Sequence, residues 1–519
     1  MNRSAGTESA TPNAGTDSDI QMLATGGTLN IIGAASQGLL NFVVVLVLMR
    51  GLGAAGSGAF FQAVGIFTIL GTAAVIGADT GLVRALPQQL VTGRQRDVIP
   101  TLRAALLPLV FVTALAAYVV FAQSTAFAAA LTEGTHTADV AAYLKVLAIF
   151  VPLYSLAYAL LAATRGMSTM VPGVVLDKMA RPLLQAIMLL VAVTVGASPS
   201  LLMMAWAVPS VVVAAGAAVW LRRLMSSAGL RRSPRTSWPI FIEFWRFTLP
   251  RAVASICRVT IQWFDVVLVG AMVSPRDAGI YAAVTRLLIL GTVVSQALAQ
   301  VSQPMFSRLL SHGSHTNAGE IYRTSTGWLI GATWPLYFSV ALFGSVILSV
   351  FGAGFPESAV ALAILALARL MSTGVGTADV VLLMGGKSAW SLGNTVVALA
   401  INIGLNLVLI PRYGIAGAAV AWAAAAVVNN VAPLVQVRWL LKIHPYGRAS
   451  FTAAAATSIS YGVVGLAVRS WLGSSVTGLV VYLVIGSALY VTLLLRWRAE
   501  LRIDRLIAVI MERRGVRHA

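Results

Sequence analysis

The sequence predicts an all-α polytopic membrane protein, and three observations support this fold class. Of its 519 residues, 58% are hydrophobic and only 10% are charged, whereas about a quarter of the residues of a soluble protein are charged. The mean hydropathy is +0.86. Apolar stretches of roughly 17 to 25 residues recur along the chain, which is the length of a membrane-spanning helix, and they lack the alternation of membrane strands.

Fourteen of these stretches are expected to be transmembrane helices. They lie near residues 29–49, 59–83, 104–122, 141–163, 182–198, 200–221, 252–273, 279–305, 326–351, 358–383, 389–410, 415–440, 451–468 and 475–495. Positions 1–20 are polar and contain three acidic residues, a composition that is not typical of a cleaved signal peptide. We therefore expect the first apolar span to be retained.

Basic residues predict how these spans are oriented. If the N-terminus is cytoplasmic, the cytoplasmic loops and tail contain 27 Lys and Arg residues, against four in the outer loops. Short cytoplasmic loops are enriched in Lys and Arg, so we expect both termini in the cytoplasm and an even number of spans. The same loops explain the net charge of +19, and no nucleic-acid partner is expected.

The sequence also predicts an internal repeat. Gly58 in GSGAFFQAV aligns with Gly279 in DAGIYAAVT at an offset of 221, and Gly166 aligns with Gly386 at an offset of 220. Six spans per repeat would relate the halves by an axis along the membrane normal. The expected organisation is a cytoplasmic tail, a six-helix bundle, a basic linker, a second six-helix bundle, two further helices and a basic amphipathic tail, at 1–24, 25–222, 223–251, 252–442, 443–495 and 496–519.

A polar stripe on the seventh span is the main candidate site. Arg251, Ser255, Arg258, Gln262 and Asp265 fall at i, i+4, i+7, i+11 and i+14, which is one face of a helix. Charged residues are costly inside a bilayer and usually face a cavity or a partner, so the stripe predicts a water-filled cavity. The alternative is an Arg258–Asp265 ion pair, or packing hydrogen bonds, with no role in transport.

Other spans also contain polar residues, which give both halves polar inner faces. Each amide pair taken alone is more often explained by hydrogen bonds between helices. The candidates are Gln37 and Asn41; Thr68, Thr72, Asp79 and Arg84; Arg286, Gln296, Gln300 and Gln303; Arg369 and Asp379; and Asn402 and Asn406.

Several motif matches are discounted, so neither a cofactor nor a metal is expected. GLGAAG joins two membrane spans and lacks the strand and helix of a dinucleotide site. His312 and His315 occur in a polar loop without an acidic cluster. Cys257 is the single cysteine, and no P-loop lysine motif for direct use of ATP is present.

Five segments resemble a known family. They are NIGLNLVLIPRYGIAGAAVAWAAA (402–425), FTLPRAVASICRVTIQWFDVVLVG (247–270), DAGIYAAVTRL (277–287), GADTGLVRAL (77–86) and VFGAGFPESAVALAILAL (350–367). Together they resemble the polysaccharide-transport family of lipid-linked oligosaccharide flippases of the O-antigen type. That family lies within the multidrug/oligosaccharidyl-lipid/polysaccharide exporter superfamily. The resemblance covers about residues 25 to 500, and Asp265 matches the family's acidic residue in span 7.

The resemblance implies a multi-pass protein of the bacterial cytoplasmic membrane that is not an enzyme. Its substrate would be an oligosaccharide on undecaprenyl pyrophosphate, flipped outward by rocking of two bundles for O-antigen or exopolysaccharide synthesis. Membrane lipids and a polysaccharide polymerase or assembly machinery would be its partners. Arginine binds phosphate bidentately, so the head group is assigned to the cavity residues, and Asp265 and Asp79 are assigned to coupling. The cavity residues are Arg258, Arg286, Arg84, Arg369, Gln262, Gln296, Gln300, Gln37 and Asn41.

The alternatives differ in their polar residues and loops. The lipid II flippase branch also has fourteen spans, but it has arginines in the first span, where this chain has Gln37 and Asn41. A multidrug or cation antiporter usually has twelve spans and an acidic residue in span 1, which this chain lacks. A membrane glycosyl ligase or polymerase would need a sizeable outer loop, whereas the longest one expected here is about 123–140. Energy would come from a proton gradient or the membrane potential.

Overall fold

Helices make up all the regular structure in the described part of the chain, which confirms the predicted all-α class. The computed structural model describes residues 14–132, 136–230, 238–352, 355 and 358–501. Parts of the predicted tails, 1–13 and 502–519, and of the predicted linker, 231–237, lie outside the described residues.

The first part of the chain forms eight α-helices together with a short 3-10 turn and a π-helical turn. In order these are α1 (Ala14–Val75), α2 (Ala78–Val91), η1 (Gln95–Asp97), α3 (Val98–Ala122), α4 (Ser124–Leu131), α5 (Thr137–Gly166), η2 (Gly173–Ala180), α6 (Arg181–Thr194), α7 (Pro199–Ala207) and α8 (Pro209–Ser227). The π-helical η2 runs directly into α6. This helical segment therefore begins nine residues before the predicted span at 182–198.

The second part forms nine α-helices. They are α9 (Trp238–Met272), α10 (Pro275–Ser311), α11 (His315–Leu348) with η3 (Ser349–Phe351), α12 (Ala359–Gly374), α13 (Ala378–Met384), α14 (Ser388–Leu441), α15 (Arg448–Thr457) with the π-helical η5 (Ser458–Val463), α16 (Val464–Leu472) and α17 (Val476–Arg496). Because α9 begins at Trp238, the last part of the predicted linker 223–251 is helical.

Nine helices of the described residues are long and apolar enough to cross a membrane, or up to 11 if each of two bent helix pairs counts as one span. Two of the long helices are interrupted by a glycine in a left-handed conformation, at Gly53 (φ 68°) in α1 and at Gly414 (φ 53°) in α14. A side chain is strained at such angles, whereas glycine adopts them readily. Both breaks fall between predicted spans, and the total of fourteen spans stays a prediction.

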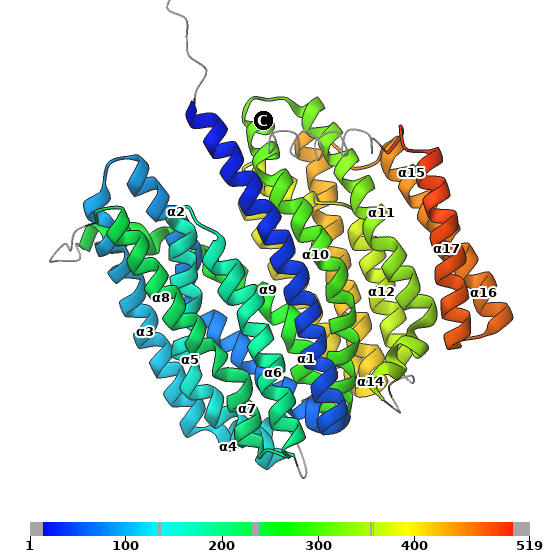
Figure 1. Cartoon of the computed structure of the whole chain (residues 1–519), viewed down its shortest axis with the longest axis horizontal. Coiled ribbons are helices and arrows are strands. Elements are labelled where there is room, and N and C mark those ends of the chain that lie inside the picture. Colours follow the sequence, from blue (N-terminus) through cyan, green and yellow to red (C-terminus); the bar gives the residue numbers. More distant parts are fainter. Residues whose placement is uncertain (1–13, 133–135, 231–237, 353–354, 356–357, 502–519) are drawn as a thin grey trace, which may run out of the picture.

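The helices stand side by side, with α1 near the middle (Figure 1). Helices α2 to α8 lie on one side of α1, and α10, α11, α12 and α14 lie on the other, with α15 to α17 forming one edge. Helix α9 contacts α2 and α3 of the first side as well as α10 and α14 of the second. Helix α1 contacts α9 and α10 as well as α5 and α6, so it joins the two sides. Figure 1 shows the start of α1 and the end of α17 at the same end of the bundle; the cytoplasmic location of that end stays a prediction.

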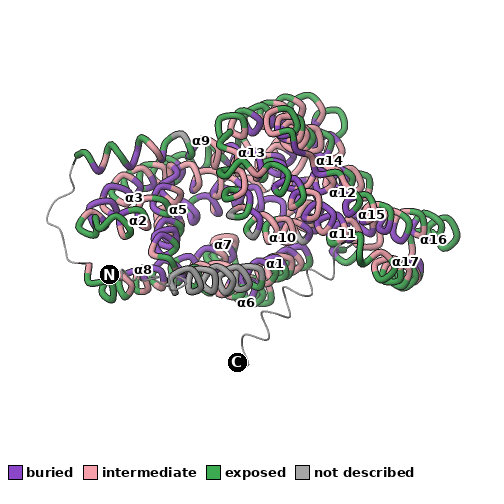
Figure 2. Tube along the Cα trace, turned by 90° about the horizontal axis from the view of Figure 1, so that it is seen from above, coloured by how far each residue is buried: buried purple, intermediate pink, exposed green. Residues whose placement is uncertain are grey.

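Buried residues lie between the helices, and exposed residues cover much of the outer surface (Figure 2). Many exposed side chains are large and apolar, among them Phe111 (71% exposed) and Trp471 (91% exposed). A soluble protein rarely exposes so much apolar surface, whereas lipid tails would cover it here. The exposed apolar surface therefore agrees with a multi-pass membrane protein.

Candidate functional site

The predicted polar stripe follows α9 from its surface into the protein core. Arg251, Arg258 and Gln262 are exposed, whereas Asp265 is 1% exposed. The guanidinium Nη2 of Arg258 donates a hydrogen bond to Ser255 Oγ at 3.1 Å. Among the described residues Arg258 makes no ion pair with Asp265, so the ion-pair alternative does not account for the stripe.

Asp265 is a buried carboxylate held by neighbouring helices. Asn406 on α14 donates its Nδ2 to Asp265 Oδ1 at 2.7 Å, and the Tyr281 hydroxyl on α10 donates to Oδ2 at 3.0 Å. One turn before Asn406, Asn402 is fully buried. The Asn402 amide group lies beside the Asp265 carboxylate, while Asn402 Oδ1 and Asn406 Oδ1 have no hydrogen-bond partner within the described structure. Buried polar atoms without a partner are costly, so the cluster has unused capacity to bind a small polar group.

Two predicted arginines, on α10 and α12, lie against aromatic rings of neighbouring helices. The Arg286 guanidinium lies 4.0 Å from the centre of the Trp263 ring, and the Arg369 guanidinium lies 4.5 Å from that of Trp422. Neither forms an ion pair with a carboxylate of the described chain. The buried Nε of Arg369 has no hydrogen-bond partner there. Aromatic rings stabilise these cations without using up their N–H donors.

Arg369 also lies close to the Asp265 cluster. Its guanidinium is near the phenol groups of Tyr281 and Tyr337, and Tyr281 is the residue that donates to Asp265. The two aromatic partners of the arginines, Trp263 and Trp422, come from α9 and α14, the helices that also supply Asp265 and Asn406. The structure thus places Asp265 and Arg369 near each other, where α9, α10, α12 and α14 meet.

The remaining predicted residues lie elsewhere, and no contact of the described structure joins them to Asp265. Arg84 is exposed on α2, with its guanidinium 3.8 Å from the Phe247 ring at the start of α9. Half-buried Asp79 lies on the first turn of α2. The amides Gln37 and Asn41 are half-buried on α1, and Gln296 and Gln300 are exposed beyond a 45° bend in α10.

Sequence reasoning missed a second charged pair, on the π-helical turn η2 and α6. Arg181 Nη2 lies 2.8 Å from Asp177 Oδ1, and the Arg181 guanidinium lies 5.6 Å from the Tyr154 ring. The i, i+4 spacing of Asp177 and Arg181 was the available signal, but both were assigned to a loop. No group of three or more His, Cys, Asp or Glu residues that could hold a metal occurs in the described part of the chain.

Solved transporters share this fold. The chain is similar to the lipid II flippase MurJ in an inward closed conformation, at 12% identity and a TM-score of 0.70, over 91% of this chain and 99% of that one. A MATE transporter from Vibrio cholerae matches at 13% identity and a TM-score of 0.61, over 85% and 100% of the two chains. These likenesses define the class of the fold, that of multi-pass MurJ- and MATE-like membrane proteins.

The chain belongs to the polysaccharide biosynthesis protein family, whose model matches residues 23–310. The resemblance found in the sequence is thereby confirmed. A curated relative, named "Probable low-salt glycan biosynthesis flippase Agl15", from Haloferax volcanii, is 28% identical over 187 residues. The match covers 34% of this chain and 38% of that relative, so the chain spans well under half of the relative's length.

Proposed function

We propose that this protein is a flippase that moves an oligosaccharide linked to undecaprenyl pyrophosphate across the cytoplasmic membrane of a bacterium. Alternating access of the two halves would expose the cavity to one leaflet and then to the other. Membership of the polysaccharide biosynthesis family supports a glycan substrate, and the partial match to a glycan flippase supports a lipid-linked one. A polysaccharide polymerase or other assembly machinery would receive the flipped product.

The observation that carries this proposal is Arg286 on the face of Trp263 with no ion-pair partner among the described carboxylates. A permanently charged side chain inside the membrane is costly and needs compensation. Compensation supplied by an aromatic ring keeps the guanidinium available for an anion. A pyrophosphate is an anion of the geometry that a guanidinium binds through two parallel hydrogen bonds.

The other cavity residues would extend this anion site. Arg369 supplies a second guanidinium with an unused buried N–H, and the exposed Arg258 and Gln262 line the route along α9. Sugar hydroxyls need both donors and acceptors, which the amide side chains provide. The polyprenyl tail would stay in the bilayer while only the polar head group crosses between the halves.

Asp265 is the proposed coupling residue, with Asp79 as the second candidate. The carboxylate is buried next to unused amide atoms of Asn402 and Asn406. Uptake of a proton or a small cation would neutralise a charge that is otherwise buried in the membrane. A gradient of that ion, or the membrane potential acting on it, would then favour one conformation over the other.

A lipid II flippase is the second candidate, because the chain shares its fold with MurJ. Both substrates carry an anionic pyrophosphate, so the arginine site suits either. An exporter of organic cations is disfavoured by the two unpaired arginines, since like charges repel.

Transport by the purified protein in liposomes separates these functions. Fluorescent undecaprenyl-pyrophosphate oligosaccharide, lipid II and a fluorescent organic cation are tested side by side, with and without an imposed proton gradient. The proposal predicts gradient-stimulated flipping of the oligosaccharide lipid. Preferential movement of lipid II would identify the second candidate, and transport of the cation alone would reject both.

A further inference from the structure

A groove lies between α2 and the first turns of α9, apart from the Asp265 cluster. Its volume is about 650 Å³. It is lined by Arg84, Trp238, Ile242, Glu243, Arg246 and Phe247. A smaller cavity of about 110 Å³ shares three of these residues and adds the α2 side chains Gln88 and Gln89. The groove lies at the end of the bundle that the distribution of Lys and Arg predicts to be cytoplasmic.

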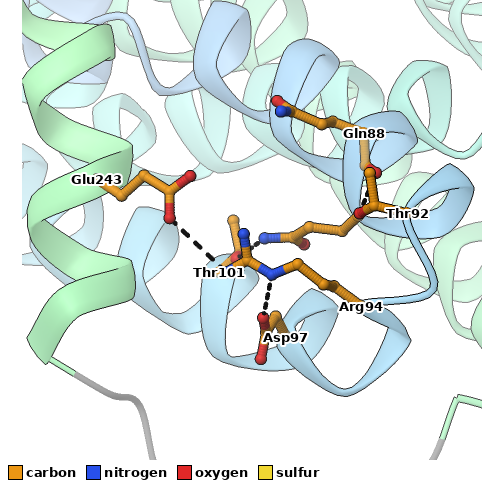
Figure 3. A network of polar contacts seen from close by, with 7 residues as sticks. Gln88, Thr92, Arg94, Asp97, Thr101 and Glu243 are labelled. Carbon is orange, nitrogen blue, oxygen red and sulfur yellow. Dashed lines mark hydrogen bonds and ion pairs between the residues drawn. The ribbon is translucent and has the colours of Figure 1, made fainter.

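The groove carries more positive than negative charge. Arg84 and Arg246 are exposed, and neither lies within ion-pair distance of a described carboxylate. Glu243 is the acidic residue of the wall, and Arg94 Nη2 lies 3.7 Å from its Oε2 (Figure 3). Arg94 is itself fixed by Asp97, at 2.8 Å from its Nε. Arg94 shares its charge between Asp97 and Glu243, so it compensates Glu243 only in part, and Arg84 and Arg246 still leave the groove with a net positive charge.

Aromatic side chains give the groove an apolar side. Trp238 is 69% exposed and stacks on Phe241, with ring centres 5.2 Å apart. The Phe247 ring has the Arg84 guanidinium at 3.8 Å and the Arg251 guanidinium at 4.7 Å. Tryptophan and arginine together are typical of the membrane interface, where a ligand with an anionic head and an apolar tail is bound.

The groove also lies next to the first residue of the polar stripe on α9. Arg251, which shares the Phe247 ring with Arg84, is the first residue of that stripe, and Arg258 follows seven positions later. Seven residues of helix correspond to about 10 Å along its axis. A phosphate released from Arg84 and Arg246 would therefore meet Arg251 and then Arg258 on its way to the membrane interior.

We propose that this groove is a loading site that binds the phosphate of a lipid-linked substrate at the cytoplasmic leaflet before the head group moves along α9. Arg84 and Arg246 would hold the phosphate, and Trp238 would contact the adjoining lipid chain. This inference rests on the proposed flippase function. It assigns Arg84 to a site distinct from that of Arg286 and Arg369.

A fluorophore in the groove reports binding there directly. The single cysteine is first removed by Cys257→Ala, and Ile242→Cys, which is 48% exposed at the groove, is then labelled with an environment-sensitive dye. The labelled protein is placed in phosphatidylcholine nanodiscs and titrated with undecaprenyl monophosphate. We expect a saturable change in fluorescence, and a dissociation constant raised about tenfold or more by Arg84→Gln/Arg246→Gln, because charge-assisted hydrogen bonds to phosphate are lost.

Matched variants distinguish loss of the arginines in the groove from a general loss of positive charge. Arg222→Gln/Arg223→Gln removes two exposed arginines from α8 and should leave binding unchanged, and Arg84→Lys/Arg246→Lys should retain most of it. Thermal unfolding of each variant checks that it is folded. An unchanged dissociation constant in folded Arg84→Gln/Arg246→Gln overturns the inference. Equal saturation by phosphatidylglycerol, or competition by inorganic phosphate alone, also overturns it and identifies a general phospholipid or a free-phosphate site.

A parallel flipping assay distinguishes an error in the proposed loading site from an error in the proposed flippase function. If the inference holds, Arg286→Gln keeps groove binding and loses flipping, whereas Arg84→Gln/Arg246→Gln loses binding and flips more slowly. Normal flipping by Arg84→Gln/Arg246→Gln overturns the loading role alone. Absence of flipping by the wild-type protein rejects the proposed function together with the loading role.

Discussion

Gly58 and Gly279, 221 positions apart and aligned in the predicted internal repeat, lie against each other between α1 and α10. A Cβ atom built on Gly58 would lie 2.7 Å from Gly279 N, and one built on Gly279 would lie 3.0 Å from Gly58 N. Each would also meet a carbonyl oxygen four residues before the other glycine, at Pro275 or Ala54. Such reciprocal contacts are what a two-fold axis between two related halves would produce.

We predict that this contact requires glycine on both helices. Gly58→Ala and Gly279→Ala should each destabilise the protein by about 1–3 kcal/mol, because the added methyl group forces two backbones apart. Gly404→Ala on α14 is the control, since nothing lies within 4 Å of its added Cβ. That variant should be neutral or slightly stabilising. Thermal unfolding in detergent measures the difference, and equal melting temperatures for all three variants would contradict the close contact.

Removing the charge of Asp265 should abolish coupling of transport to a gradient without lowering the stability of the protein. In Asp265→Asn the buried carboxylate becomes a neutral amide, so we expect an equal or higher melting temperature and flipping that no longer responds to a gradient. Asn406→Leu keeps the charge and removes a 2.7 Å hydrogen bond, and it should lower stability by about 1–3 kcal/mol. If Asp265→Asn retains gradient-stimulated flipping, Asp265 is not the coupling residue.

Trp263 is predicted to position Arg286 for the head group. A cation–π contact contributes about 0.5–2 kcal/mol, so Trp263→Leu should raise KM for the lipid-linked oligosaccharide about 2- to 30-fold. Trp263→Phe keeps an aromatic face and should show a smaller effect. Trp471→Leu alters a surface residue that is 91% exposed, and it serves as the control. Kinetics in which Trp263→Leu matches the control would show that the ring does not hold the arginine.

The predicted orientation can be tested with single cysteines, because Cys257 is the only native one. In a Cys257→Ala background, Ser311→Cys at the end of α10 should react with a membrane-impermeant maleimide only after the cytoplasmic face is opened. Ser474→Cys, between α16 and α17, should react in intact cells. The opposite pattern would invert the predicted topology. Reactivity of both from one side would refute the odd number of crossings, five, that is predicted between Ser311 and Ser474.

The membrane fold could be predicted because its signals are local. Apolar stretches and loop arginines are recognised within short segments of the sequence. Both glycines at which the structure breaks its longest helices, Gly53 and Gly414, fall between predicted spans. The number of spans is harder to predict, because one helix of the structure can run through two predicted spans, as α1 and α14 do.

The site was predicted less completely because its contacts join distant positions. The stripe on α9 followed from helical spacing, but the partner of Asp265 is Asn406, 141 positions away. The i, i+4 pair Asn402 and Asn406 was visible in the sequence, yet nothing local connects it to Asp265. Arg84 was grouped with Arg286 on charge alone, whereas the fold places Arg84 against Phe247 at the start of α9.

The most direct test of the flippase proposal is the flipping rate of undecaprenyl-pyrophosphate oligosaccharide in proteoliposomes under a proton gradient. Wild type, Arg286→Gln and Arg308→Gln are compared, the last removing an exposed arginine at the end of α10. We predict gradient-stimulated flipping by the wild type and Arg308→Gln, and a rate at least about tenfold lower for Arg286→Gln, since a charge-assisted bidentate contact is lost. Equal rates for Arg286→Gln and wild type would contradict the central claim that an unpaired intramembrane arginine carries the anionic head group.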